Sequence, residues 1–169
     1  LVAMQKSGKI PTVVTHNDTK LNNVLIDEET GEGICVIDLD TVMPGLALYD
    51  FGDMVRTATN SAPEDERDLA RVTMRLEVFE SLVRGYLSSA KSFLNADELT
   101  LLPFSGKILS FECGIRFLTD YLQGDTYFKT RRPGQNLDRC RCQLRLVASI
   151  EEQTEAMMKV VSKIHAETP

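Results

Sequence analysis

The chain has 169 residues, of which 43% are hydrophobic and 26% are charged, a balance typical of one globular domain with its own core. Its net charge of −6 argues against nucleic acid or an anionic membrane as the main partner. It contains no apolar run of about 18 residues and no charged, apolar and small-residue leader, so neither a transmembrane segment nor a signal peptide is visible in these residues.

Two short apolar segments near the start of the chain, residues 23–27 and 34–38, flank the turn-forming residues 28–33. This pattern predicts a β-hairpin. Such a hairpin would bring Asn23, at the start of one strand, beside Asp38, at the end of the other.

The spacing of Asp18, Asn23 and Asp38 is typical of a phosphoryl-transfer catalytic loop. In that chemistry the first carboxylate accepts the proton of the attacking hydroxyl, so we predict that Asp18 is catalytic. The amide and the second carboxylate hold the Mg²⁺ ion that bridges the phosphates of ATP, so we predict that Asn23 and Asp38 are metal ligands. The alternative is that these residues are only turn formers and loop caps. The hairpin and the position of Asp38 favour the catalytic interpretation.

A further carboxylate, Asp50, begins the sequence Asp-Phe-Gly, which carries a metal ligand in protein kinases. Asp50 follows a Pro-Gly turn and not a strand, and the residues after it have helical apolar spacing. We therefore predict that Asp50 is the N-cap of a helix running from Phe51 to about Ala58, with a structural role.

The rest of the chain is predicted to be helical. Apolar residues recur at helical spacing over 64–90, 96–121 and 137–164. Asn95 is expected to cap the second of these helices and Pro103 to kink or restart it. Residues 124–136 are predicted to form a loop. The predicted fold class is therefore α+β and mainly helical, with a small catalytic β-hairpin and several long helices.

The loop that follows the second long helix is another candidate functional region. Arg116, Asp120 and Tyr127 could supply the fixed polar groups and the aromatic face that a sugar requires. The alternative is that Arg116 forms a surface ion pair and Tyr127 only packs.

The four cysteines, at positions 35, 113, 140 and 142, accompany only two histidines. A Cys-x-Cys pair with so few histidines is a poor zinc set. We expect Cys35 in a core strand and Cys113 in a helix, both as small buried hydrophobic residues. All four are expected to be reduced, as in a cytoplasmic enzyme.

Several motifs carry a resemblance to known enzymes. His16-Asn17-Asp18, in place of the His-Arg-Asp of protein kinases, and Ile37-Asp38-Leu39-Asp40, in place of Asp-Phe-Gly, resemble the aminoglycoside phosphotransferase and choline kinase family. The longer segments 16–20, 37–45 and 119–128 resemble the bacterial N-acetylhexosamine 1-kinases more narrowly. This resemblance implies a protein-kinase-like fold that uses ATP as cosubstrate and Mg²⁺ as cofactor.

The resemblance also implies roles for individual residues. Arg116 and Tyr127 would line the sugar pocket. From the loop itself we predict that Asp18 also contacts the acceptor, that His16 braces the catalytic loop and that Asp40 helps to position metal or substrate.

No G-x-G-x-x-G loop and no strand lysine precede the catalytic loop, whereas a complete kinase carries both in an N-terminal lobe. We therefore expect residues 1–169 to be a single C-terminal lobe, holding the catalytic loop and the substrate site, from which the nucleotide lobe is absent. Such a lobe would be inactive alone.

The predicted activity is transfer of the ATP γ-phosphate to the anomeric hydroxyl of N-acetylglucosamine or N-acetylgalactosamine, with the sugar and ATP as partners. One alternative changes only the acceptor, to an aminoglycoside, choline or homoserine. Another is a desulfatase acting in a mucin-glycan pathway, but the chain lacks the C/S-x-P-x-R motif of sulfatases. A binding-only pseudokinase is disfavoured by the intact Asp18, Asn23 and Asp38.

Overall fold

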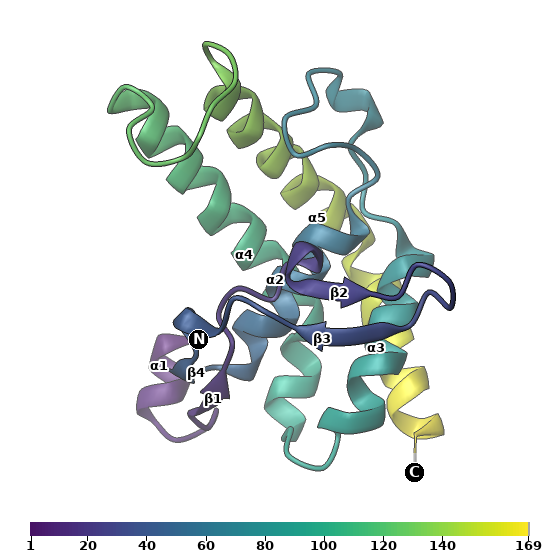
Figure 1. The fold of residues 1–169 in the computed structure, drawn as a ribbon. Coiled ribbons are helices and arrows are strands. Elements are labelled where there is room, and N and C mark those ends of the chain that lie inside the picture. The colour runs from purple at the N-terminus through teal and green to yellow at the C-terminus, as the bar shows by residue number, and fades with distance from the viewer. Residues whose placement is uncertain (169) are drawn as a thin grey trace.

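The computed structural model describes residues 1–168 and has the predicted α+β, mainly helical fold (Figure 1). Four helices, α2 to α5, form the body, and two small antiparallel sheets lie on one side of it. The helices are α1 (Val2–Lys6), α2 (Ala47–Thr59), α3 (Leu76–Ala90), α4 (Ala96–Leu122) and α5 (Gln135–Glu167). The strands are β1 (Val13–Thr15), β2 (Val24–Ile26), β3 (Gly33–Val36) and β4 (Met43–Gly45). Short 3₁₀ helices cover Leu21–Asn23, Leu39–Thr41 and Leu69–Arg71.

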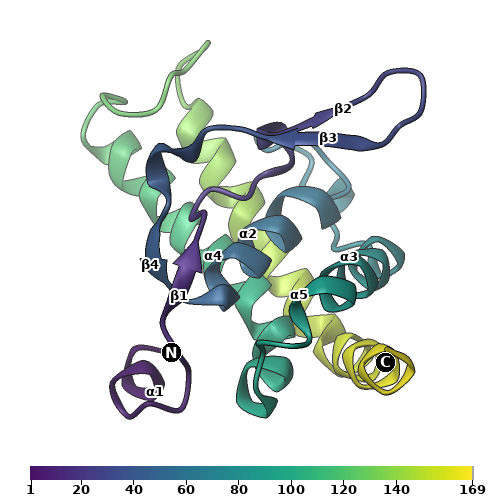
Figure 2. The same cartoon turned by 60° about the horizontal axis from the view of Figure 1, so that its bottom comes forward.

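The predicted hairpin is present as the antiparallel pair of β2 and β3, in which Val24 pairs with Val36. The Ile37 amide donates to the Asn23 carbonyl oxygen at 2.9 Å, so the ends of the two strands lie side by side. Figure 2 shows the hairpin projecting from the helical body. Because it projects, β3 is exposed along its whole length. Cys35 is therefore exposed, and the prediction that it is buried is wrong.

The long helices pack with α4 between α2 and α5, and α3 lies against both α2 and α5. Phe51, Phe79, Leu102 and Leu146 are each 0% exposed in the core that these helices share. The crossing of α2 and α4 is unusually close. A Cβ atom on Gly52 would lie 2.4 Å from the Ser105 carbonyl oxygen, so this crossing requires glycine.

The start of α4 agrees with the sequence. The Asn95 side chain accepts a hydrogen bond from the Glu98 amide, and the Glu98 carboxylate accepts one from the Asn95 amide, each at 3.0 Å. This reciprocal pair is a capping box. Pro103 is buried inside α4, and the helix continues through it without restarting. No helix among residues 1–168 combines the length and apolar composition needed to cross a bilayer.

The predicted helix over 64–90 is only half correct, because α3 begins at Leu76. The residues before it fold back against the end of α2, where Asn60 forms an isolated bridge with Met74. Val72 and Met74 are buried while Thr73 between them bonds to Ser61, an extended alternation. Because Val72 lies three residues after Leu69 and four before Leu76, the same apolar residues also match the spacing of a helix.

Candidate active site

The catalytic loop, residues 16–20, lies between β1 and the first 3₁₀ helix, and Asp50 fixes its backbone. One Asp50 carboxylate oxygen accepts the His16 amide at 2.8 Å and the other accepts the Asn17 amide at 2.7 Å. The Thr19 hydroxyl donates to the Asp50 carbonyl oxygen at 2.6 Å. Asn17 adopts the left-handed conformation, with φ 62°, which Asn tolerates better than most residues.

Asp50 is not the N-cap of α2, and that prediction is wrong. The helix begins four residues earlier than expected, at Ala47, with Leu46 at the N-cap position. Asp50 therefore lies within the first turn, and its side chain leaves the helix to hold the catalytic loop. Its role is structural, as expected, but it stabilises a loop and not a helix end.

His16 connects the catalytic loop to the end of the hairpin. Its Nε2 atom lies 3.0 Å from the Ile37 carbonyl oxygen, and its Nδ1 atom accepts the Asp18 amide at 3.3 Å. Since Nδ1 accepts, the proton of a neutral ring belongs on Nε2, which then donates to Ile37. This arrangement suits the predicted bracing role of His16.

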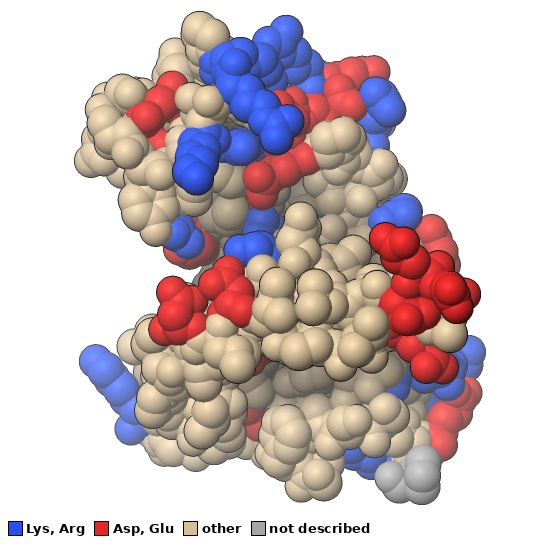
Figure 3. Space-filling view, in the orientation of Figure 1, with Lys and Arg blue, Asp and Glu red and all other residues tan. Residues whose placement is uncertain are grey.

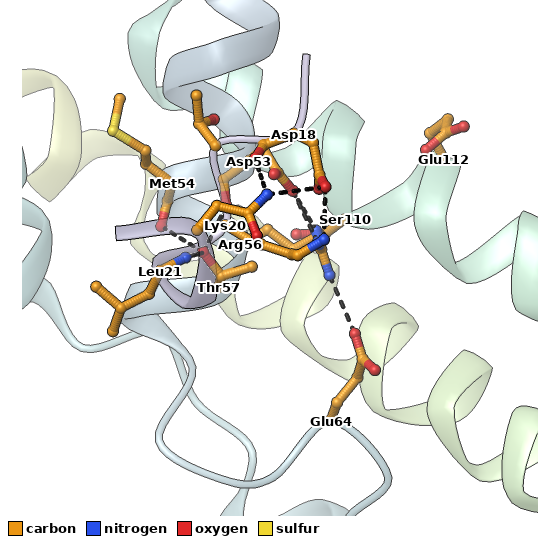
Figure 4. A network of polar contacts seen from close by, with 12 residues as sticks. Asp18, Lys20, Leu21, Asp53, Met54, Arg56, Thr57, Glu64, Ser110 and Glu112 are labelled. Carbon is orange, nitrogen blue, oxygen red and sulfur yellow. Dashed lines mark hydrogen bonds and ion pairs between the residues drawn. The ribbon is translucent and has the colours of Figure 1, made fainter. Parts of the chain in front are cut away.

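The catalytic loop and the hairpin bring Asp18, Asn23 and Asp38 together around Lys20. Figure 4 shows Asp18 and Lys20 side by side, with Asp53 and Arg56 of α2 close to them. The Asn23 amide nitrogen donates to Asp18 Oδ2 at 2.9 Å. Lys20 Nζ lies 2.5 Å from Asp18 Oδ2 and 3.7 Å from Asp38 Oδ2. Asp38 is held at this point by a left-handed backbone, with φ 65°. Asp40 is exposed, and nothing in the structure gives it a contact here.

The charges of the site favour an ionised Asp18. Burial opposes ionisation, but the hydrogen bonds from Lys20 and Asn23 outweigh it and hold the pKa of Asp18 below its ordinary value. Burial also opposes the charge on Lys20, yet the hydrogen bond to Asp18 raises the pKa of Lys20. Asp18 and Lys20 therefore form an ion pair at neutral pH.

The oxygens that Asn23 and Asp38 present fit a magnesium ion that is bound together with a nucleotide. Mg²⁺ prefers oxygen ligands and, in phosphoryl-transfer sites, takes one or two of them from protein and the rest from phosphates and water. The Asn23 amide points its nitrogen at Asp18, which leaves its oxygen for another ligand. Among residues 1–168, no group of three or more His, Cys, Asp or Glu side chains could hold a metal by itself.

A cavity of about 370 Å³ opens beside Asp18. Figure 3 shows the molecule hollowed on one side, with acidic side chains gathered at the lower rim of the hollow. Across the cavity from the catalytic loop, α4 contributes an apolar wall and two charged side chains. The lining residues are Asn17, Asp18, Tyr49, Asp53, Arg56, Ile108, Leu109, Glu112, Cys113 and Arg116.

A buried ion pair lies at the base of this cavity. Arg56 contacts Asp53 Oδ1 through Nη2 at 2.7 Å and through Nε at 2.8 Å, and it reaches Glu64 at 3.2 Å. The other Asp53 oxygen is buried without a hydrogen-bond partner among the described residues. Burial raises the pKa of the neighbouring Cys113 thiol to about 11, so this cysteine is a neutral thiol at pH 7.

The predicted sugar-binding residues are divided between two surfaces. Arg116 lines the cavity beside Asp18, and its guanidinium carbon lies 5.9 Å from the centre of the Tyr127 ring. Tyr127 lines an adjacent hollow and is 73% exposed. Arg116 also pairs with Glu112 at 3.7 Å. Asp120 lies at the edge of the same hollow but is 3% exposed, and its carboxylate accepts hydrogen bonds from backbone amides and from Asn136, so few of its hydrogen-bonding positions remain for a ligand.

Three residues of the site were not predicted from the sequence. Lys20 lies two residues after Asp18, and this proximity was the only available signal. Asp53 and Arg56 have the i, i+3 spacing of a helical ion pair, which is usually a surface feature. Only the packing of α2 against α4 shows that this pair is buried beside the cavity.

The first half of the chain matches a known family. Residues 2–84 match the model of the phosphotransferase enzyme family. The matched region contains Asp18, Asn23 and Asp38, together with Asp50, which holds the loop. The match supports the aminoglycoside-phosphotransferase, kinase-like family that the sequence motifs indicate, and this family implies transfer of a phosphoryl group.

Proposed function

We propose that this protein transfers the γ-phosphoryl group of ATP to the anomeric hydroxyl of an N-acetylhexosamine. The observation that carries the proposal is the convergence of Asn23, Asp38 and Lys20 on Asp18, which itself lines a cavity large enough for a monosaccharide. Ligand cavities of roughly 300 to 1,000 Å³ are usual for small molecules.

Asp18 orients the acceptor and receives its proton. An ionised carboxylate with a lowered pKa is a weak base, so it accepts a hydrogen bond from the hydroxyl in the ground state. Proton transfer to Asp18 accompanies formation of the bond between acceptor oxygen and phosphorus, while the bond from phosphorus to the ADP oxygen breaks. A weak base is sufficient because the transition state of phosphoryl transfer is loose.

Lys20 and the two metal ligands act on the phosphate side of the site. The Lys20 ammonium group has three donors, and it can bind a transferring phosphoryl oxygen while it remains close to Asp18. Asn23 and Asp38 would hold Mg²⁺, which neutralises the charge of the nucleotide phosphates when it is bound. His16 and Asp50 keep the loop in position for both ligands.

The acceptor occupies the cavity between the catalytic loop and α4. Ile108 and Leu109 offer an apolar wall for the apolar face of a sugar ring, and Arg116 offers donors for a hydroxyl or carbonyl oxygen. This mixture of apolar surface and a few polar groups is typical of small-molecule sites.

The test is a nucleotide-consumption screen of the full-length protein with N-acetylhexosamines, other sugars, aminoglycosides, choline and homoserine. The proposal expects the highest kcat/KM with an N-acetylhexosamine, and no acceptor-dependent consumption by the Asp18→Asn variant. A preference for one of the other acceptors would retain the chemistry and overturn the substrate. Absence of acceptor-dependent consumption with every compound would overturn the proposed activity.

A further inference from the structure

The carboxylate of Asp120, near the end of α4, binds four N–H groups. One oxygen accepts the amides of Thr126 and Tyr127 at 2.9 and 2.8 Å. The other oxygen accepts the Phe128 amide at 2.9 Å and the Asn136 side-chain amide at 2.8 Å. Few hydrogen-bonding positions remain on this carboxylate, and the residue is 3% exposed.

Asn136 extends this network to the bend of the loop. Its side-chain nitrogen also donates to Asp125 Oδ1 at 2.9 Å. Asp125 adopts the left-handed conformation, with φ 58°, which is uncommon for a residue other than glycine. Asp120 and Asn136 thus fix both the bend and the three residues after it.

The loop fixed in this way carries the aromatic side chains next to the cavity. The rings of Tyr127 and Phe128 lie edge to face, with centres 4.8 Å apart. The Arg116 guanidinium carbon lies 5.4 Å from the centre of the Phe128 ring and 5.9 Å from that of Tyr127. Phe117 packs against Phe128, with ring centres 4.7 Å apart. Arg116 is therefore held between the aromatic loop and the cavity that it lines.

We infer that Asp120 is a positioning residue for acceptor recognition: it orders residues 125–128 so that Tyr127 and Phe128 hold Arg116 at the mouth of the cavity. Asp120 does this without touching the acceptor, because its oxygens are occupied by the loop. This inference rests on the proposed function, since it requires that the acceptor bind beside Arg116.

The first test replaces Asp120 by Asn in the full-length protein. An amide has one acceptor oxygen, so two of the four N–H donors would face an NH₂ group. We expect the KM for the acceptor to rise about tenfold, with kcat within about threefold and the KM for ATP unchanged. An unchanged acceptor KM, or a loss confined to kcat, would overturn the inference.

A matched control is Glu98→Gln at the opposite end of the same helix. Glu98 is also a buried carboxylate that accepts a backbone amide, and glutamine retains this bond in a capping box. Its acceptor KM should equal that of the wild type. Asn136→Leu, which removes one donor and the link to Asp125, should raise the acceptor KM by about threefold. It tests the inference if Asp120→Asn does not fold.

A second measurement does not depend on activity. Residues 1–169 contain no tryptophan, so Tyr127→Trp in this chain places a single fluorescent reporter on the loop. We expect its fluorescence anisotropy to fall when Asp120→Asn is added and to stay the same when Glu98→Gln is added. An anisotropy that does not respond to Asp120→Asn would overturn the positioning role, even if the protein phosphorylates no acceptor in the screen. If instead the proposed activity is wrong, the screen shows no acceptor-dependent nucleotide consumption, while the anisotropy still falls with Asp120→Asn.

Discussion

Asp18 and Asp50 are both carboxylates of the catalytic region, but their partners differ. Asp18 contacts side chains, Lys20 and Asn23, at the mouth of the cavity. The Asp50 carboxylate, in the part of the chain that the structure describes, accepts hydrogen bonds only from backbone amides of the loop. Asp18 can therefore replace one of its side-chain hydrogen bonds by a bond to a substrate hydroxyl, whereas Asp50 keeps the backbone of the loop in one conformation.

Replacing Asp18 by Asn should therefore abolish turnover and leave nucleotide binding intact. Loss of a general base lowers rates by roughly 10²–10⁴-fold, and the substitution leaves Asn23 and Asp38 in place. The measurements are kcat of the full-length protein and its affinity for Mg·ATP by calorimetry. Turnover within a factor of about three of the wild type would exclude Asp18 as the catalytic residue.

Asp38→Ala and Asp50→Ala should give opposite patterns. The Asp38 side chain is 48% exposed, so its loss should abolish Mg²⁺-dependent turnover at a small cost in stability. The free energy of unfolding should fall by only about 1 kcal/mol, mainly because alanine tolerates the left-handed backbone at this position less well than aspartate. Asp50→Ala leaves two loop amides without a charged acceptor and should lower the free energy of unfolding by about 2–3 kcal/mol. Urea unfolding with parallel rate measurements distinguishes them. An Asp50→Ala protein that is as stable as the wild type but has lost its Mg²⁺-dependent turnover would reverse the two assignments.

The sequence was sufficient to predict that Asn23 and Asp38 lie close together, because the strands of a hairpin are close to each other in the sequence. It was not sufficient for Asp50, whose partners lie more than thirty positions earlier in the chain. A capping residue and a loop anchor have the same local pattern, a polar residue before a helical apolar run. For the same reason Asp120 was interpreted as a ligand-binding residue, although its carboxylate is occupied by the loop.

At the level of the helices, the absence of a side chain at Gly52 allows α2 and α4 to approach each other closely. Gly52→Ala should lower the free energy of unfolding by about 1–3 kcal/mol, because the new methyl group would collide with the backbone of α4. Gly85 in α3 is a matched control, since a Cβ there meets nothing within 4 Å. Gly85→Ala should be stabilising by about 0.5–1 kcal/mol. Urea unfolding of both variants checks this, and equal effects would contradict the close crossing.

The elements differ in how far they can be predicted. The hairpin, the capping box at Asn95 and the long helix α5 each carry a strong local signal. The segment before α3 was predicted to be helical because Leu69, Val72 and Leu76 have helical spacing. It contains only the short 3₁₀ helix Leu69–Arg71, followed by extended residues that Ser61 and Ser149 hold. These partners lie on other elements, and no local pattern indicates them.

For the whole molecule, carboxylates with lowered pKa values tie stability to pH, and Asp18, Asp120 and Asp138 are three of them. Burial opposes the charge of Asp18, Asp120 and Asp138, but hydrogen bonds lower the pKa of each, from Lys20, the Phe128 amide and Arg132 respectively. Because the folded pKa is depressed, the stabilisation is complete above the unfolded value, about 3.9. It is lost as the pH falls below that value toward the folded pKa.

Thermal melts between about pH 6 and about pH 2.5 should therefore show a Tm that is level at first and falls below about pH 4. Asp138→Asn should have a lower Tm at pH 6 and a shallower fall, since this variant lacks one of the titrating groups. A Tm that rises on acidification through this range would contradict the direction of all three pKa shifts.

The most direct measurement on the whole enzyme is ³¹P NMR of the full-length protein with ATP, Mg²⁺ and N-acetylglucosamine. The proposal predicts ADP and one new phosphate-ester signal that is coupled to the anomeric proton of the sugar, and neither with Asp18→Asn. Formation of ADP with only inorganic phosphate, or of an ester on another hydroxyl, would contradict the proposed transfer to the anomeric oxygen.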